Sequence, residues 1–310
     1  MTFFERALEL AERGRGTTHP NPVVGAVVVR DGEIVGESWH ERKGEPHAEP
    51  RALEQAGERA KGATVYVTLE PCSRHGSTPP CSEALVAAGV AQVVVGAADP
   101  MQDGVGALRA AGVEVDVLDA WEARQQNEAW LIWAREGRPF VTYKAAVTLD
   151  GRLTVPGERW VSGEESRRLV HELRAASDAV AVGMGTVRAD DPRLDARGVD
   201  AVRQPRRLAF GRGPLPAGSE LELRSGELEV ELRALAEEDV QSLLLEGGAT
   251  LANSFLRAGL VDKLLLFVAP KLSGAGPHLL EALPAPVTLT RLSARQAGED
   301  VLLTAYVHEP

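Results

Sequence analysis

Short runs of aliphatic and β-branched residues alternate with segments of helical composition along the chain, and this alternation limits the possible folds most strongly. A short apolar run indicates a buried strand, whereas apolar residues at intervals of three or four indicate one face of a helix. Strands that alternate with helices build a largely parallel sheet whose two faces the helices cover. The sequence therefore predicts an α/β fold.

The first half of the chain follows this pattern from its start. Residues 23–30 and 34–39 flank Asp31-Gly32, a dipeptide typical of a tight hairpin turn. Further strands are expected at 63–69, 91–97 and 113–118, and helices at 3–13, 46–60, 81–88, 105–111 and 120–135.

Length and a polar break divide the chain into two domains. At roughly 150 residues per domain, 310 residues correspond to two. The segment Glu136-Gly137-Arg138-Pro139 interrupts the alternation, so we expect domains at 1–137 and 138–310. In the second half, strands are expected at 140–147, 179–182, 242–245, 263–269 and 301–307, helices at 164–176 and 249–258, and irregular structure at 196–239.

Composition narrows the class of protein. The net charge of −11 gives no broad positive field of the kind that non-specific nucleic-acid binding requires, so no nucleic-acid partner is expected. No run of about 18 apolar residues is present, so no transmembrane helix is expected. Charges at Glu5 and Arg6 argue against a signal peptide and predict a cytoplasmic protein. Two cysteines in a reducing compartment indicate metal binding or catalysis rather than a disulfide scaffold.

A set of metal-ligating residue types lies at three element boundaries of the first half. His47 precedes a helix, Cys72 follows a strand and Cys81 opens the next helix. One imidazole and two thiolates suit tetrahedral zinc and leave a fourth position for water. Zinc lowers the pKa of such a water to about 7. The pattern therefore predicts a catalytic zinc site.

Glu49 completes a deaminase signature. His-x-Glu followed by Pro-Cys and a second Cys is typical of zinc deaminases, although here nine positions separate the two cysteines. Glu49 is the expected catalytic residue, taking the proton of the water and passing it to the ring nitrogen and the leaving amine. Asn21, held between two prolines, is expected to bind substrate; alternatively it only begins the hairpin.

Other interpretations of the cysteines remain open at this point. Both are compatible with small core residues, and His75 is available as a fourth ligand of a purely structural zinc. A nucleic-acid-editing deaminase requires a basic groove, against which the net charge weighs.

Glycines and arginines of the second half are typical of a dinucleotide site. Gly183-Met184-Gly185-Thr186 resembles a phosphate-binding turn, and Gly247-Gly248 follows a strand and opens a helix. A plain strand-end turn is the alternative for both. The cluster Arg203, Arg206, Arg207 and Arg212 fits the 2′-phosphate of NADPH better than the ribose hydroxyl of NADH; the alternative is an ordinary solvated loop.

Taken together, these residues resemble the bifunctional riboflavin-biosynthesis deaminase/reductase family of bacteria. The resemblance rests on Pro20-Asn21-Pro22-Val23-Val24-Gly25, His47-Ala48-Glu49, Pro71 to Cys81, Arg138-Pro139-Phe140-Val141, Lys144, Leu149-Asp150-Gly151, Trp160, His171 to Ala175, Gly183 to Pro192 and Leu245-Glu246-Gly247-Gly248.

The resemblance implies a cytidine-deaminase-like first domain and a dihydrofolate-reductase-like second domain, with zinc and NADPH as cofactors. It implies deamination of a phosphorylated ribosylamino-pyrimidine, followed by reduction of its ribose to a ribityl chain. A homodimer or higher homo-oligomer is the expected assembly. By resemblance, the zinc ligands are His47, Cys72 and Cys81, the substrate-binding residues Arg174, Leu194, Arg197 and Glu246, and the cofactor-binding residues Ala146, Trp160, Thr186, Asp190 and Gly248. Lys144 and Asp150 receive no firm role.

The chain departs from the family pattern in its second half. It is shorter than the family over 203–240, where a nucleotide-binding strand and helix are expected, and Gly211-Arg212 replaces the usual Asp followed by Ser or Thr. The alternative to a bifunctional enzyme is therefore a deaminase whose C-terminal half is a binding or dimerisation module.

Overall fold

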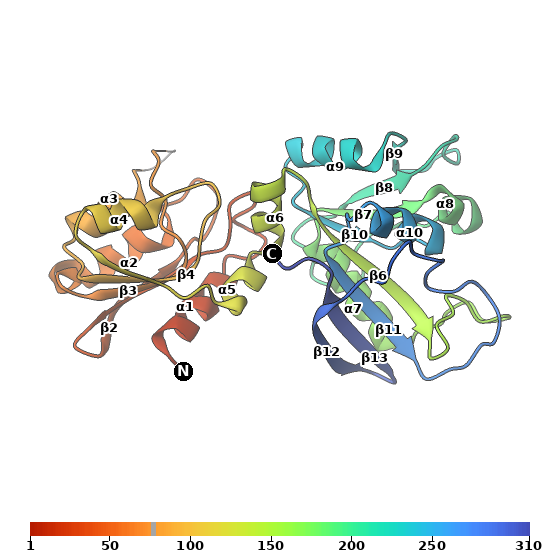
Figure 1. Cartoon of the computed structure of the whole chain (residues 1–310), viewed down its shortest axis with the longest axis horizontal. Helices are drawn as coiled ribbons and strands as arrows, with labels where there is room; N and C mark the ends of the chain where they lie inside the picture. The colour runs from red at the N-terminus through yellow and green to blue at the C-terminus, as the bar shows by residue number, and fades with distance from the viewer. Residues whose placement is uncertain (76–78) are drawn as a thin grey trace. The chain divides into compact units, whose positions relative to one another are not determined.

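The computed structural model describes residues 1–75 and 79–310, so the part of the expected Cys72–Cys81 loop at 76–78 lies outside the described residues. Two compact units, Met1–Arg135 and Glu136–Glu309, account for nearly all of the chain (Figure 1). Each unit is described by itself.

A five-stranded sheet in the order β2-β1-β3-β4-β5 forms the centre of the first unit. β1 and β2, and likewise β1 and β3, are antiparallel, whereas β3, β4 and β5 run parallel. The strands are β1 Gly25–Arg30, β2 Glu33–Trp39, β3 Thr64–Leu69, β4 Gln92–Ala97 and β5 Glu114–Val117. The helices are α1 Phe3–Glu12, α2 Ala48–Ala56, the 3₁₀ turn Gly57–Ala60, α3 Cys81–Ala87, α4 Gly104–Ala110, α5 Trp121–Gln126 and α6 Glu128–Glu136.

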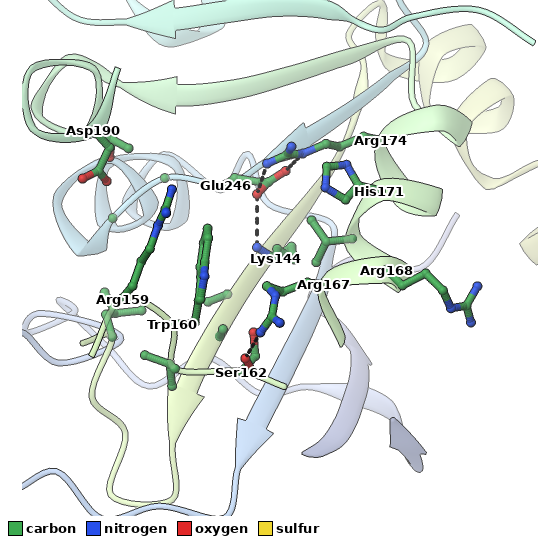
Figure 2. A pocket seen from close by; sticks show the side chains of 18 of the residues that line it. Lys144, Arg159, Trp160, Ser162, Arg167, Arg168, His171, Arg174, Asp190 and Glu246 are labelled. Carbon is green, nitrogen blue, oxygen red and sulfur yellow. Dashed lines mark hydrogen bonds and ion pairs between the residues drawn. The ribbon is translucent and has the colours of Figure 1, made fainter. Parts of the chain in front are cut away.

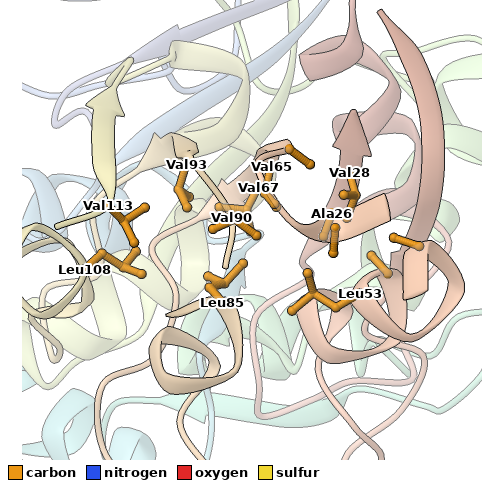
Figure 3. Close-up of a cluster of buried hydrophobic side chains, with 14 of the residues drawn as sticks. Ala26, Val28, Leu53, Val65, Val67, Leu85, Val90, Val93, Leu108 and Val113 are labelled. Atoms are coloured by element: carbon orange, nitrogen blue, oxygen red, sulfur yellow. The ribbon is translucent and has the colours of Figure 1, made fainter. Parts of the chain in front are cut away.

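Helices cover both faces of this sheet. Ala52, Leu85 and Leu108, from α2, α3 and α4, pack with Val65 and the other inward-facing strand residues of one core (Figure 3). On the other face Leu10 of α1 packs against Val27 and Val29. Two glycines permit close approach: a Cβ at Gly25 would lie 2.1 Å from the Ala7 carbonyl oxygen, and one at Gly36 equally close to that of Ala52. α2 is thereby held directly on the hairpin.

Local sequence explains the hairpin and one unexpected helix break. Asp31 and Gly32 both have positive φ, as the tight turn between twisted strands requires. The single helix expected at 120–135 is wrong: the structure divides it at Asn127. The Asn127 amide accepts a hydrogen bond from Val23 N–H at 2.9 Å and donates one to the Val23 carbonyl at 2.9 Å. The Asn127 side chain thus binds the backbone of Val23, two residues before β1, and α5 ends just before Asn127.

An eight-stranded sheet in the order β12-β13-β11-β6-β10-β7-β8-β9 forms the second unit. Strands from β11 to β9 in this order are parallel, and β13 and β12 add an antiparallel edge. The strands are β6 Phe140–Thr148, β7 Ala179–Gly183, β8 Arg206–Phe210, β9 Glu222–Arg224, β10 Ser242–Leu245, β11 Lys263–Ala269, β12 Thr290–Ala297 and β13 Asp300–Tyr306. The helices are α7 Glu164–Ala176, α8 Met184–Asp190, α9 Leu228–Glu237 and α10 Ala249–Arg257.

The expectation of irregular structure at 196–239 is wrong. β8, β9 and α9 lie there, so the shortened segment still contains a strand and a helix. Leu208, Ala209 and Phe210 are buried in the sheet interior, and Leu232 and Leu235 of α9 pack into the same core as Leu208 and Phe210. Surrounding charges masked this short apolar run. The exposed edge strand β12 was not predicted either, because its side chains lack an apolar alternation.

The arrangement brings several strand ends to one edge. β10, β7 and β8 are parallel neighbours, so Glu246, the start of α8 and the residues after Phe210 lie at the same edge of the sheet. In open α/β sheets, ligands bind at the carboxyl ends of the strands. Among the described residues, no helix combines the length and the apolar character needed to cross a bilayer.

Candidate functional site

Three ligand atoms converge in the first unit. His47 Nδ1 lies 3.7 Å from Cys72 Sγ and 3.3 Å from Cys81 Sγ, and all three atoms lie within 4.8 Å of one another. Zinc bonds of about 2.3 Å to sulfur and about 2.0 Å to nitrogen, at a tetrahedral angle, separate such atoms by about 3.5 Å. The donor set and its spacing therefore fit zinc.

Element boundaries explain why these residues meet. His47 is the N-cap of α2, Cys72 follows the end of β3, and Cys81 is the first residue of α3. The backbone N–H of Cys81 donates a hydrogen bond to Cys72 Sγ at 3.2 Å. A hydrogen bond from the Cys81 thiol, together with His47, lowers the pKa of Cys72 to about 4, while the same contact and burial raise the pKa of Cys81. The thiolate form is therefore favoured at Cys72 over Cys81.

Glu49 lies in the first turn of α2, two residues after His47. Its side chain is 3% exposed, and burial raises the pKa of its carboxyl group. A hydrogen bond links it to Cys81, but its Oε2 has no hydrogen-bond partner in the described structure. A buried oxygen without a partner costs stability unless a ligand completes it. This orphaned atom fits a reacting water or substrate at the metal group.

Asn21 and His75, both in loops, differ in their relation to the metal group. Asn21 Nδ2 lies 3.2 Å from His40 Nε2, and the His40 ring contacts His47 edge to face, with 5.1 Å between ring centroids. Asn21 is therefore linked to the metal group through His40. His75 is exposed and is not a member of the three-residue group found among the described residues. A fourth protein ligand from His75 is thus not supported.

A pocket of about 650 Å³ lies in the second unit (Figure 2). It brings together eight of the nine substrate- and cofactor-binding residues predicted there: Ala146, Trp160, Arg174, Thr186, Asp190, Arg197, Glu246 and Gly248. The ninth, Leu194, is buried in the apolar cluster with Val187 and Leu221 and adopts a φ of 56°. Any contact of Leu194 with a ligand would therefore involve its backbone.

Glu246 lies at the centre of this pocket between two cations (Figure 2). Its carboxylate accepts hydrogen bonds from Lys144 Nζ at 3.1 Å and from Arg174 Nε at 2.6 Å. Burial acts to raise the pKa of Glu246, but Lys144 and Arg174 outweigh it and lower the pKa to about 2. Glu246 is therefore ionised at all physiological pH values.

This pKa shift predicts a pH-dependent contribution to stability. Because the folded-state pKa lies below the model value of 4.5, the stabilisation by Glu246 is complete above about pH 4.5 and disappears as the pH falls toward about 2. Urea unfolding of the wild type and Glu246→Gln should give a difference in unfolding free energy that is constant from pH 7 to 5 and smaller at pH 3.5. A difference independent of pH over that whole range would contradict the assignment.

Cations surround a half-exposed tryptophan at the pocket mouth. The guanidinium carbons of Arg159 and Arg167 lie 5.1 and 5.5 Å from the Trp160 ring centroid. Trp160 is 50% exposed, so its ring offers a flat surface to a ligand. The six cations that line the pocket, against three carboxylates, are Lys144, Arg159, Arg167, Arg168, Arg174 and Arg197. The site is therefore positive in a chain of net charge −11 and suits a phosphorylated ligand.

Residues that the sequence left without a role also line this pocket. Arg167 and His171 lie on the same face of α7 as Arg174, at spacings of four and three residues. That periodicity was available in the sequence. Desolvation lowers the pKa of His171, and Arg174 and Arg197 contribute to the same shift.

A neighbouring pocket of about 600 Å³ shares Leu153, Thr186 and Gly248 with the first. Its wall includes Gly183 and Gly185, and a Cβ at Gly185 or Gly248 would meet nothing within 4 Å. Bare backbone that opens into a pocket at the N-terminus of α10 fits a pyrophosphate. The two pockets together fit a dinucleotide cofactor.

Comparison with known proteins assigns both halves. Residues 1–97 match the cytidine and deoxycytidylate deaminase zinc-binding region, and residues 139–303 match the RibD C-terminal domain. The riboflavin biosynthesis protein RibD of Aquifex aeolicus is 39% identical over 97% of this chain and 96% of its own length. That of Escherichia coli is 41% identical over 91% and 90%.

Solved structures agree with this assignment. RibD of Acinetobacter baumannii superposes with a TM-score of 0.86 at 36% identity, covering 98% of this chain and 97% of that one. A Thermotoga maritima diaminohydroxyphosphoribosylaminopyrimidine deaminase/5-amino-6-(5-phosphoribosylamino)uracil reductase superposes with a TM-score of 0.84 at 33% identity, with the same coverage. The predicted α/β fold class is confirmed. A C-terminal half reduced to a binding module is not favoured, because the reductase domain matches along its length.

The chain therefore belongs to the RibD family of riboflavin-biosynthesis enzymes, with a zinc-dependent deaminase half and an NADPH-dependent reductase half.

Proposed function

We propose that residues 1–137 deaminate 2,5-diamino-6-ribosylamino-4(3H)-pyrimidinone 5′-phosphate and that residues 138–310 reduce the product, 5-amino-6-(5-phosphoribosylamino)uracil, at its ribose. The observation that carries the first step is the spacing of the His47, Cys72 and Cys81 donor atoms beside the orphaned Glu49 oxygen. The positive pocket at the carboxyl edge of the second sheet supports the second step. The choice of both substrates is supported by the two activities that the Thermotoga maritima relative is named for.

His47, Cys72 and Cys81 are the proposed zinc ligands. Zinc held there supplies a water nucleophile of lowered pKa at neutral pH. The Cys81 backbone N–H and the position of Cys81 at the start of α3 favour the thiolate form. Cys72 lies three residues beyond the end of β3, and Cys81 is the first residue of α3.

Glu49 is the proposed proton carrier of the deamination. Its free Oε2 accepts the proton of the attacking water and delivers it to the ring nitrogen. The same carboxyl group then takes the remaining proton from the hydroxyl group added to the ring carbon and delivers it to the amine, which leaves as ammonia as the carbonyl forms. The raised pKa of Glu49 suits a group that must hold a proton between these steps. Asn21 is proposed to hold the substrate, oriented by His40.

The second pocket system is the proposed reductase site. NADPH supplies a hydride to C1 of the opened ribose or its imine. Arg174, Arg197 and Glu246, with the Leu194 backbone, are proposed to hold the phosphorylated substrate. The proposed cofactor contacts are Ala146, Trp160, Thr186, Asp190 and Gly248.

Lys144 is the proposed proton donor of the reduction. It is the lysine that lines the pocket, and its ammonium group is held 3.1 Å from Glu246 Oε2. When hydride reaches C1, negative charge develops on the neighbouring oxygen or nitrogen of the substrate. An ammonium group at this position neutralises that charge and supplies the proton.

We further propose a cytoplasmic enzyme that acts as a homodimer or higher homo-oligomer on a small phosphorylated pyrimidine. The experiment that tests the two-step function supplies purified protein with the diaminopyrimidinone phosphate. Without NADPH, ammonia release and accumulation of the uracil product are expected. With NADPH, the absorbance of NADPH at 340 nm should fall in proportion to the ammonia released. Ammonia release without any oxidation of NADPH would contradict the reductase assignment.

A further inference from the structure

Four arginines suggested a 2′-phosphate site from the sequence, but three of them are occupied. Arg203 is paired with Asp178, Arg206 with Glu222 at 2.6 Å, and Arg207 with Glu220 at 2.7 Å. These three guanidinium groups stabilise the β8 surroundings and are not available to a ligand without breaking an ion pair.

Arg212 differs from the other three. Its side chain is exposed, and within residues 1–75 and 79–310 the structure assigns it no ion pair or side-chain hydrogen bond. It lies two residues beyond the end of β8, whose last residue, Phe210, is paired in register with Gly183. Gly183 and Gly185 form a wall of the smaller pocket. Arg212 therefore follows a strand end that adjoins the proposed cofactor site.

A second cation is attached to the same turn. Arg188, on α8, donates a hydrogen bond from Nη2 to the Arg212 carbonyl oxygen at 2.6 Å. Gly213 adopts a φ of 111°, which favours glycine, and a Cβ there would lie 2.8 Å from that Nη2. Gly211 N–H in turn donates to the Arg224 carbonyl oxygen of β9 at 2.9 Å. The turn thus has hydrogen bonds to both α8 and β9.

We propose that Arg212 and Arg188 form the recognition site for the 2′-phosphate of NADPH. Two guanidinium groups that have no carboxylate partner among the described residues match a phosphate dianion, whereas recognition of a ribose 2′-hydroxyl group needs an acidic residue. Arg212 thus places a positive charge at the position where the family usually has Ser or Thr. The inference rests on the proposed NADPH-dependent reduction and adds the residues that select this cofactor over NADH.

Binding measurements on the full-length zinc-loaded protein test the proposal without any turnover. Isothermal titration calorimetry would compare NADPH with NADH, and 2′,5′-ADP with 5′-AMP, at fixed ionic strength. Arg212→Gln and, separately, Arg188→Gln should weaken NADPH and 2′,5′-ADP binding roughly tenfold to a hundredfold, as expected for a charged hydrogen bond. NADH and 5′-AMP affinities should change by less than about twofold.

Arg207→Gln is the matched control, because it removes an equally charged side chain from β8 that is paired with Glu220. It should leave the ratio of NADPH to NADH affinity unchanged. Ribose 5-phosphate separates the two phosphate sources: its binding should be insensitive to Arg212→Gln, since the substrate phosphate is assigned to the larger pocket. Arg212→Lys should retain part of the preference for NADPH.

Four results would overturn the proposal. Equal weakening of NADPH and NADH in Arg212→Gln would assign the arginine to the pyrophosphate. A loss confined to ribose 5-phosphate would assign it to the substrate. Equal affinity of the wild type for NADPH and NADH would contradict the 2′-phosphate site alone. No binding of either cofactor would contradict the proposed reduction as well.

Discussion

Glu49→Gln is expected to slow deamination by about 10²- to 10⁴-fold in kcat, the usual contribution of a positioned general acid–base group. The amide keeps the size of the side chain but does not accept and return a proton. Because Glu49 is not one of the three ligand-atom donors, zinc content should remain at the wild-type level. Ammonia release by the purified variant, with metal analysis of the same sample, measures both quantities.

Glu54→Gln is the matched control for this substitution. Glu54 lies on the same helix, α2, but is exposed, so the same chemical change should leave deamination unaltered. Reduction of the deaminated substrate should also be unaltered in Glu49→Gln, since that site lies in the other unit. Full deamination by a zinc-loaded Glu49→Gln variant would exclude Glu49 as the proton carrier.

Asp262→Ala is expected to lower the free energy of unfolding of the second unit by about 3–5 kcal/mol, because Arg138 loses its buried acidic partner and keeps its ion pair with the partly exposed Glu136. Asp262 is 0% exposed and accepts two hydrogen bonds from the Arg138 guanidinium, each 2.7 Å long, and one from Val141 N–H at 2.8 Å. The contact joins the start of β6 to the start of β11. Urea unfolding followed by circular dichroism measures the loss.

Two further variants separate the buried charge from a general effect of mutation. Glu220→Ala breaks the exposed ion pair with Arg207 and should cost at most about 1 kcal/mol. The double variant Arg138→Met/Asp262→Leu removes both charges and should regain a large part of the lost stability. If Asp262→Ala were no more destabilising than Glu220→Ala, the pair would not stabilise the unit as proposed.

Most helices and strands with a regular pattern of buried apolar residues were predicted from the sequence. α7, at Glu164–Ala176, and the hairpin around Asp31 follow directly from helical periodicity and turn chemistry. The failures have tertiary causes. Asn127 divides a helix because its amide binds Val23, more than one hundred residues earlier in the chain. β8 was missed because arginines surround three buried residues, and their carboxylate partners are identified only by the fold.

The candidate sites show the same division. His47, Cys72 and Cys81 were recognised from residue type and element boundaries, and the structure brings their donor atoms together. The roles of Lys144 and Arg212 were not predictable in this way. Lys144 is defined by its contact with Glu246, and Arg212 by the absence of an ion pair among the described residues, whereas its neighbours are paired. Both are properties of pairs of residues that are distant in sequence.

The most direct test of the central claim is X-ray absorption spectroscopy at the zinc edge of the purified full-length protein. We expect one zinc per chain, with two sulfur neighbours at about 2.3 Å and two nitrogen or oxygen neighbours at about 2.0 Å, one of them exchangeable with solvent. Loss of one sulfur neighbour in Cys72→Ser should accompany loss of deamination. A shell of four protein donors without an exchangeable position, or active protein free of zinc, would contradict the account.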